Sequence, residues 1–461
     1  MIQVRATRYA AQAGASLSNM RAESMLLTRR QWLSMASTGA CGALAPSRSM
    51  AAQNEAQREL ERRIGRLISE YEGQGFHRTG TEVDRRSADW LYEEVRRIGL
   101  VPARESFALS RIDPVRAGLI LRDRRIEGLP LFDGAFTAED GIGGRLGPIG
   151  SEAEIGLVEA PPNTAAAGPL GEARRQQRHK ALVCVTRGGR PGLCPSNADS
   201  FLRPFGPPVL QVSSEESSFL SDQAQGRAEV RLIASVRRTA TSALSVTAKL
   251  NGKNSALLPL IVMTPRSGWY SCASERGGGI ACWLELMRTL REQQPIRDVL
   301  FVASSGHELG HLGIDEFVGR RPGIVPQSVG WIHLGANIGA AMLPAMTVPV
   351  SGDSPERRHA TPVMGSGNTI QASDDEFEAI LSRAMTSEDL GIARRNPRGR
   401  VPGGEAETVH RGGGRYLSVI GSNALFHNPA DRGANSVDLE VIARFTKAFA
   451  TVAEVLLSNP K

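Results

Sequence analysis

The order of apolar and polar positions predicts that the chain opens with amphipathic helices. In residues 55–70, four apolar side chains recur at helical spacing: Leu60, Ile64, Leu67 and Ile68. Residues 85–100 carry a second stripe of the same period: Ala88, Leu91, Val95 and Ile98. The segment between them is rich in glycine and polar residues, which is typical of a turn. We therefore expect a helical opening that ends near Pro102.

Residues 111–240 have a different character and predict a β-rich insert. Short β-prone runs such as "LVCVT" and "PVLQVS" alternate with connections rich in glycine and proline, such as "APPNTAAAGPLG". Few stretches here carry a helical period. The pattern therefore separates residues 52–110, the helical opening, from this insert.

From about residue 241 onward, strand and helix patterns alternate. The runs "LLPLIVMTP" and "RDVLFVASS" are continuously apolar, as expected for buried strands. Residues 277–295 and 436–457 have helical periods, and 329–340 is strand-like. The alternation predicts an α/β fold with a mostly parallel or mixed central sheet flanked by helices. Residues 241–461 would then form the main domain, with ligands at the carboxyl ends of the strands.

Composition narrows the possible classes of protein. The 461 residues are 41% hydrophobic and 22% charged, which is ordinary for globular proteins, and no apolar run is long enough to cross a membrane. The formal charge is +7, but residues 1–51 hold six arginines and one glutamate, so the remainder is nearly neutral. With 5% aromatic residues and no basic stripe, we do not expect nucleic-acid binding.

The basic N-terminus has the pattern of a twin-arginine export signal. Arg29 and Arg30 precede a weakly apolar segment rich in alanine, glycine and serine, followed by small residues near Ala51. Residues 1–51 thus predict a periplasmic or secreted protein, and the alternative is a disordered basic tail. The context of Cys41 is poor for lipid attachment.

Four cysteines remain after this segment: Cys184, Cys194, Cys272 and Cys282. Export to an oxidising compartment permits disulfides, and a Cys184–Cys194 bridge would close a short loop. Four unpaired, partly buried thiols are the other possibility.

The stretch "SSGHELGHLG" contains an HExxH motif at residues 307–311. In a zincin this motif lies within a helix, where both histidines face one zinc ion. Here Gly306 and Gly310 weaken a helix by about 1 kcal/mol each, and an apolar strand immediately precedes the motif. We therefore expect His307 and Glu308 in a turn at the carboxyl end of a strand.

The stretch "RDVLFVASSGHELGHLGIDEFV" resembles the strand-turn-helix of the co-catalytic zinc aminopeptidase and glutamate carboxypeptidase family. The resemblance covers most of the chain after the export signal. It includes "GFHRTGTEVDRRSADWLYEEVRRIGL" and "LFHNPADRGANSVDLEVI", and the insert resembles a protease-associated domain. Together with the export signal, it implies an exported metallopeptidase that uses zinc to hydrolyse a peptide or an acylated amino acid.

Carrying the zinc ligands of that family onto this sequence gives an incomplete set. The resemblance retains Glu308 and His427 as ligands, and places Glu275 where the family has a metal-bridging aspartate. Two other ligand positions fall on Pro265 and Gly335, which have no side-chain donor atom.

The position of the family's catalytic base falls on His307, which could move a proton near neutral pH. His311 and His333 are further candidates for a rearranged single-zinc site, because three protein ligands and a water suffice for catalysis. The sequence leaves two hypotheses open. One is a hydrolase with a degenerate or rebuilt metal site that holds one zinc ion or none. The other is an inactive peptidase homologue, a pseudoenzyme that binds a ligand or a partner.

Overall fold

The computed structural model describes residues 48–122, 124–343, 363–364 and 367–458. Residues 55–461 form one compact unit. Almost all of the predicted export segment, including Cys41, lies outside the described residues. The helical opening is present as α2 (Arg48–Glu72) and α3 (Glu82–Ile98). Thr81 caps α3 by accepting a hydrogen bond from the Asp84 amide, and Gly99 ends it at a φ of 91°.

The centre of the fold is a mixed sheet, which confirms the predicted α/β class. In spatial order this part of the sheet consists of β1 (Pro102–Leu121), β7 (Glu229–Leu250), β9 (Val299–Ser304), β8 (Leu260–Pro265), β10 (Gly330–Leu334), β15 (Tyr416–Ile420), β13 (Asn368–Ala372) and β14 (Ile392–Arg395). The strands β9, β8, β10 and β15 run parallel to one another, whereas β7 pairs with β9, and β13 with β15, in the antiparallel sense.

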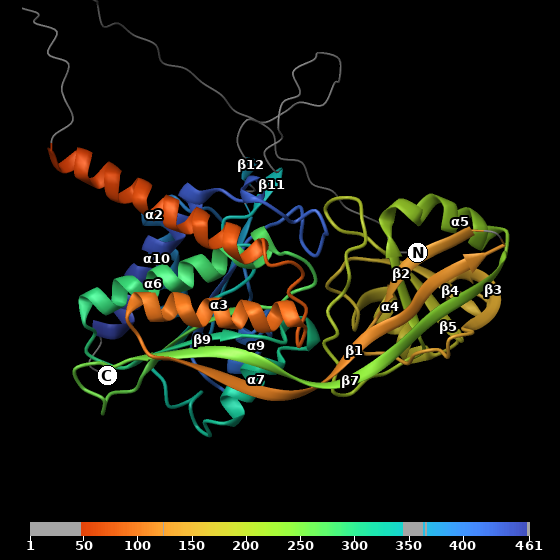
Figure 1. Ribbon diagram of the computed structural model, residues 1–461, viewed down its shortest axis with the longest axis horizontal. Coiled ribbons are helices and arrows are strands. Elements are labelled where there is room, and N and C mark those ends of the chain that lie inside the picture. Colours follow the sequence, from red (N-terminus) through yellow and green to blue (C-terminus); the bar gives the residue numbers. More distant parts are fainter. Residues whose placement is uncertain (1–47, 123, 344–362, 365–366, 459–461) are drawn as a thin grey trace, which may run out of the picture. The chain divides into compact units, whose positions relative to one another are not determined.

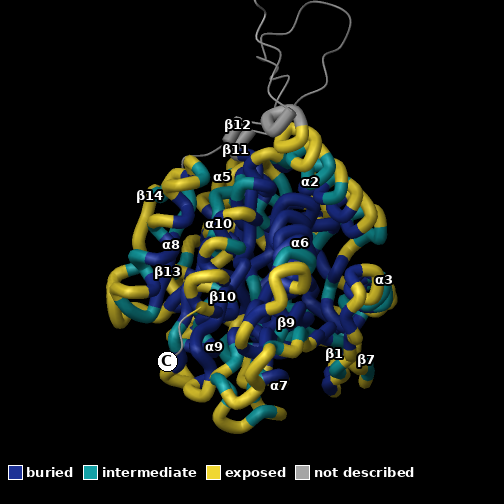
Figure 2. The backbone as a smooth tube through the Cα atoms, turned by 90° about the vertical axis from the view of Figure 1, so that its left-hand side faces the viewer, coloured by how far each residue is buried: buried dark blue, intermediate teal, exposed yellow. Residues whose placement is uncertain are grey.

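Helices cover both faces of this sheet (Figure 1). Successive residues of a strand point to opposite faces, so Val262 of β8 joins one apolar cluster while Ile261 and Met263 join another. Figure 2 shows that buried residues follow β9, β10 and α6. The Val262 side packs against α2, α3, α6 (Gly278–Gln293), α8 (Asp375–Ser387) and α10 (Leu439–Ser458), and the opposite side packs against α7 (Leu312–Gly319) and α9 (Ala406–Arg411).

The β-rich segment closes on itself. Its strands follow the order β1-β2-β6-β5-β4-β3-β7, and β7 pairs again with β1. These strands enclose a separate apolar cluster. The elements added here are β2 (Arg124–Pro130), β3 (Ile142–Pro148), β4 (Ile155–Ala160), α4 (Gly168–Gln176), β5 (Ala181–Thr186), β6 (Val209–Ser213) and α5 (Ser217–Gln225).

Two long strands are common to the closed barrel and the central sheet. β1 and β7 pair from Pro102↔Ala248 to Ile120↔Arg231, with one irregularity between Pro114 and Arg116. The limits of the insert that the composition indicates, 111 and 240, fall inside these strands. The insert therefore grows from the end of an extended antiparallel ribbon.

The remaining elements are short, and several of them lie close to the site described below. They are the 3-10 turns η1 (Ser214–Glu216), η3 (His307–Leu309) and η4 (Ala434–Ser436), the π-helical turn η2 (Ala273–Gly277), and the strand pair β11 (Ala341–Leu343) and β12 (Val363–Met364).

All four described cysteines are buried and unpaired, so the possible Cys184–Cys194 bridge is not formed. Within the described ranges, no helix has the length and apolar character needed to cross a membrane.

Candidate ligand site at the carboxyl edge of the sheet

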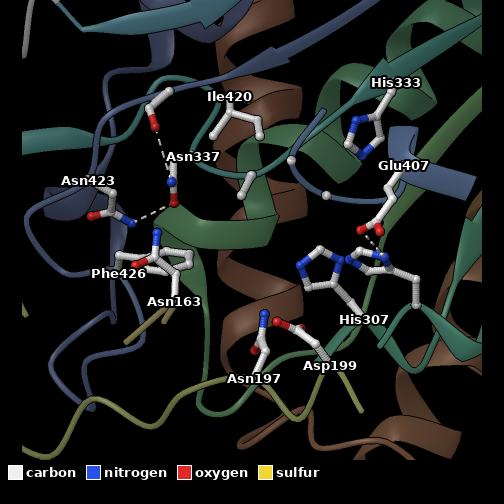
Figure 3. Close-up of a pocket in the computed structure, with 15 residues that line it drawn as sticks. Asn163, Asn197, Asp199, His307, His333, Asn337, Glu407, Ile420, Asn423 and Phe426 are labelled. Carbon is white, nitrogen blue, oxygen red and sulfur yellow. Dashed lines mark hydrogen bonds and ion pairs between the residues drawn. The ribbon is translucent and has the colours of Figure 1, made fainter. Parts of the chain in front are cut away.

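A polar pocket of about 480 Å³ lies where parallel strands of the central sheet end (Figure 3). This edge is where open α/β sheets commonly bind ligands. The lining is mainly polar: asparagine and histidine side chains and two carboxylates, with a few apolar groups. The residues are Asn163, Asn197, Asp199, His307, His311, His333, Ala336, Asn337, Gly403, Gly404, Glu407, Ile420, Gly421, Asn423 and Phe426.

The HExxH motif lies in a turn, as the sequence predicts, and not in a zincin helix. β9 ends at Ser304, and the backbone then takes left-handed conformations at Gly306, Gly310 and His311, with φ of 90°, 80° and 66°. These reversals break any continuous helix through the motif. The turn places the rings of His307 and His311 5.0 Å apart, centre to centre, and both line the pocket.

Burial favours the neutral state of the three pocket histidines. Burial lowers the pKa of His333 to about 4 and that of His307 well below its usual value, and it also lowers the pKa of His311. The positive charge of the buried Arg276 acts in the same direction on all three. Imidazoles that stay neutral can each donate one hydrogen bond and accept another.

The two ring nitrogens of His333 have different surroundings. Nδ1 lies 2.8 Å from the Ser418 hydroxyl, whose oxygen also accepts a hydrogen bond from Gln371. Nε2 faces the pocket side of the ring. It has no partner among the described residues, and the side chain is fully buried at the pocket wall.

Two acidic residues beside the pocket histidines, Glu405 and Glu407, were not among the candidates identified from the sequence. They lie around the start of α9, in a segment rich in glycine and arginine. Glu405, just before α9, accepts a hydrogen bond from Ser304 and lies 3.7 Å from Nδ1 of His307. Glu407 lies 4.0 Å from Nδ1 of His311. The only sequence signal is the "GGEAE" run, in which two acids follow a glycine pair.

The β-rich insert also contributes to the pocket. Asn197 and Asp199 come from the loop between β5 and β6 and line the pocket beside His307 (Figure 3). The Ala198 amide donates to the Glu308 carbonyl at 2.8 Å, which ties this loop to the turn after β9. Nothing in the local sequence distinguishes these residues from other loop residues.

Glu308 does not line the pocket. Its carboxylate is fully buried and accepts hydrogen bonds from the Thr79 amide at 2.6 Å and the Ser267 hydroxyl at 2.7 Å. Ser267 in turn accepts from the amides of Gly306 and His307. Glu308 is thus an internal acceptor that holds the turn after β9 against the segments that follow α2 and β8.

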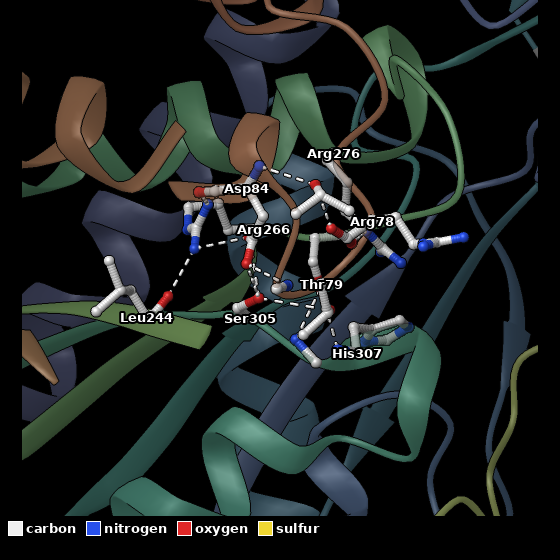
Figure 4. Close-up of polar contacts among 12 residues, drawn as sticks. Arg78, Thr79, Asp84, Leu244, Arg266, Arg276, Ser305 and His307 are labelled. Carbon is white, nitrogen blue, oxygen red and sulfur yellow. Dashed lines mark hydrogen bonds and ion pairs between the residues drawn. The ribbon is translucent and has the colours of Figure 1, made fainter. Parts of the chain in front are cut away.

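A buried polar network continues from this point (Figure 4). Thr79 accepts from the Gly306 amide, and the Ser305 hydroxyl lies 3.0 Å from the Asp84 carboxylate. Asp84 forms an ion pair of 2.9 Å with Arg266, which follows Pro265 directly. These contacts hold the segments after α2, β8 and β9 together inside the protein.

Glu275 and His427 lie close to each other, and Arg276 lies beside the same carboxylate. His427 donates through Nδ1 to the Pro195 carbonyl at 2.6 Å and presents Nε2 at 3.4 Å from Glu275. Arg276 lies 2.7 Å from the same Glu275 oxygen, and all three side chains are buried. Burial opposes ionisation of Glu275, but Arg276, and then His427, outweigh it and lower the pKa of the carboxyl below its usual value.

Solved structures share this architecture. BSAP, a zinc aminopeptidase from Bacillus subtilis, aligns with a TM-score of 0.67 at 15% identity, over 88% of this chain and 96% of that one. A peptidase precursor from Shewanella amazonensis aligns with a TM-score of 0.65 at 14% identity, over 88% and 97%. The chain has a zinc aminopeptidase fold. No protein-family model and no curated protein matched the sequence.

The zinc aminopeptidase fold raises the question of whether these residues fit a pair of zinc ions. Within the described part of the chain, no three histidine, cysteine, aspartate or glutamate side chains are arranged to hold a metal ion. Glu308 uses both oxygens inside the protein, and Glu275 already has a cationic partner. Pro265 and Gly335 supply no donor atom. The residues present do not fit two zinc ions.

The rearranged single-zinc site is not assembled either. His307, His311 and His333 share the pocket, but Glu308 and His427 are not part of its lining. Hydrogen bonds inside the protein hold the side chains of Glu308 and His427 away from the pocket lining.

Proposed function

We propose that this protein is a ligand-binding member of the zinc aminopeptidase fold that does not hydrolyse peptides with a pair of zinc ions. The orientation of Glu308 carries the proposal. A carboxylate that accepts from a backbone amide and a hydroxyl inside the protein is committed to the fold. The pocket, by contrast, keeps free hydrogen-bonding groups at the edge where this fold class binds ligands.

The proposed ligand is a short peptide or an acylated amino acid. Amide side chains suit such a ligand because each offers both a donor and an acceptor to peptide groups. Asn163 and Asn197 line the pocket, together with the apolar ring of Phe426. Asn337 and Asn423 also line it, but their amides are hydrogen-bonded to each other and to neighbouring groups of the protein. His333 adds a ring nitrogen, Nε2, that has no partner among the described residues. This lining is the observation that supports the proposal.

The test combines zinc content, hydrolysis and binding. We expect the purified protein to hold less than one zinc ion per chain and to leave aminoacyl and N-acyl substrates intact, with or without added zinc. We expect a panel of short peptides and N-acyl amino acids to include ligands that raise the melting temperature. Two tightly held zinc ions together with hydrolysis would contradict the proposal.

We also propose that the chain is exported folded by the twin-arginine route, because of Arg29 and Arg30. A reporter fused to residues 1–52 should reach the periplasm of a bacterial host. Export should stop in the R29K/R30K variant and in a host that lacks the translocase. Export of that variant at the unchanged rate would contradict the route.

A further inference from the structure

We propose that the guanidinium of Arg276 is a built-in cation that takes over, at Glu275 and His427, the charge-balancing role that the fold family gives to zinc. The inference rests on the proposed function in one respect, namely that no zinc pair is held. It goes further by naming the group that replaces the metal charge and by making the fold independent of metal.

The turn η2 directs both members of the pair inward. All five residues of this π-helical turn are buried, and Glu275 and Arg276 are adjacent within it. The Glu275 amide donates to Asp431 at 3.0 Å, which fixes the backbone beneath the carboxylate. Arg276 Nε donates to the Ser267 carbonyl at 2.9 Å. The guanidinium is thus held between the end of β8 and Glu275.

Other groups gather around the same carboxylate. Nε2 of His427 lies 3.4 Å from one oxygen, and the Cys272 sulfur lies 3.7 Å from the other. The His427 ring is oriented by its Nδ1 bond to Pro195, the kind of outer hydrogen bond that commonly orients a metal-binding histidine. Without Arg276, this buried carboxylate would face an imidazole and a thiol, with no fixed positive charge among these groups.

A buried carboxylate without a counter-charge is costly. The structure supplies that charge from the next residue in the chain, where a metal-dependent relative would take it from solution. Arg276 also makes this environment unfavourable for a second cation, because Glu275 is already neutralised at 2.7 Å.

The test uses the full mature chain and compares four proteins: wild type, Arg276→Ala, Arg276→Lys and the double variant Glu275→Gln with Arg276→Ala. The melting temperature of each is measured with EDTA and with zinc at about 0.1 mM, since binding to the folded state raises it. Bound zinc is counted by mass spectrometry after dialysis.

We expect the wild-type melting temperature to be the same under both conditions. The alanine variant should melt several degrees lower in EDTA and regain part of the loss with zinc, with bound zinc rising accordingly. The lysine variant keeps the charge and should lose less. The double variant has no buried charge to balance. Its melting temperature should be higher than that of the alanine variant and should be the same with EDTA and with zinc.

Three results would overturn the inference: a wild type that holds zinc or is stabilised by it, an alanine variant as stable as wild type or indifferent to zinc, or a double variant no more stable than the alanine variant. If the alanine variant does not fold, the inference is still tested by the zinc content of the wild type and by whether the double variant folds. A zinc-free wild type that nevertheless hydrolyses peptides would defeat the proposed function and leave the role of Arg276 standing.

Discussion

The carboxylate of Glu308 illustrates how the contacts of one side chain decide its chemistry. The sequence places an acid at the end of a buried strand, and the structure puts it there. The sequence could not show that the Thr79 amide, which is 229 residues away in the chain, donates a hydrogen bond to one oxygen of this carboxylate. The Ser267 hydroxyl donates to the other oxygen. Its own oxygen already accepts hydrogen bonds from two backbone amides, so its proton is left for Glu308. Long-range partners of this kind leave no local pattern.

Replacing Glu308 tests this structural role. In Glu308→Gln, one of the two oxygens becomes an NH₂ group that meets a donor, because neither the Thr79 amide nor the engaged Ser267 can accept from it. We expect a loss of about 2–4 kcal/mol in the free energy of unfolding, measured by chemical denaturation. The matched control is Glu316→Gln on the exposed side of α7, which should change stability by less than about 0.5 kcal/mol. Equal effects of the two would contradict the role.

His77 gives a prediction about pH. Its ring stacks on Tyr71 with centres 3.8 Å apart, and burial lowers its pKa to about 3. The unfolded chain therefore gains a proton first as pH falls, so the stability that His77 contributes is present above about pH 6.5 and is lost on acidification toward pH 3.

Wild type should accordingly lose stability between pH 7 and pH 4. His77→Gln should show a shallower dependence over this range, by at most about 1.4 kcal/mol per pH unit. The measurement is the free energy of unfolding from urea titrations at several pH values. An unchanged slope in the variant would show that His77 binds its proton at the same pH in the folded and the unfolded chain.

At the scale of the elements, sequence patterns predicted the regular strands and helices but not the short or irregular segments. Continuous apolar runs identified β8 and β9, and helical periods identified α3, α6 and α10. The glycines at 306 and 310 correctly excluded a zincin helix. α9 escaped notice because its six residues lie within a segment rich in glycine and arginine. The pocket loop between β5 and β6 escaped because tertiary contacts alone bring it to the site.

The position of the loop between β5 and β6 leads to a prediction about ligand binding. Asp199 lines the pocket, so Asp199→Asn should change the affinity for a bound peptide or acylated amino acid by roughly 5-fold or more, as expected for loss of one charged contact. Its effect on the free energy of unfolding should be small, since the residue is exposed. Calorimetric titration measures the affinity. Asp222→Asn, on the exposed side of α5, is the control; if both variants bind alike, the loop does not contribute to recognition.

At the scale of the whole molecule, the shared ribbon couples the barrel to the central sheet. Val246 of β7 pairs with Arg104 on one side and Ala303 on the other. Residues 55–461 form one compact unit. The sequence predicted two parts with a boundary near residue 240, because composition changes there, but strand pairing continues across it.

We therefore expect residues 55–461 to unfold in one calorimetric transition. Val246→Pro should abolish folding of the barrel as well as the sheet, because proline removes a ladder hydrogen bond from a strand that is paired on both edges. Circular dichroism and limited proteolysis would follow both parts. Two well-separated transitions, or a protease-resistant barrel in the proline variant, would contradict this coupling.

The ribbon of β1 and β7 also has a consequence for how such a protein can be remodelled. Because Ile120 and Arg231 face each other across an antiparallel ladder, a tight hairpin could join the two strands there and omit everything between. The order of the remaining strands would be untouched. Inserting a different domain at the same hairpin tip would exchange one wall of the pocket, and with it the ligand specificity. The strand order of the central sheet would stay the same.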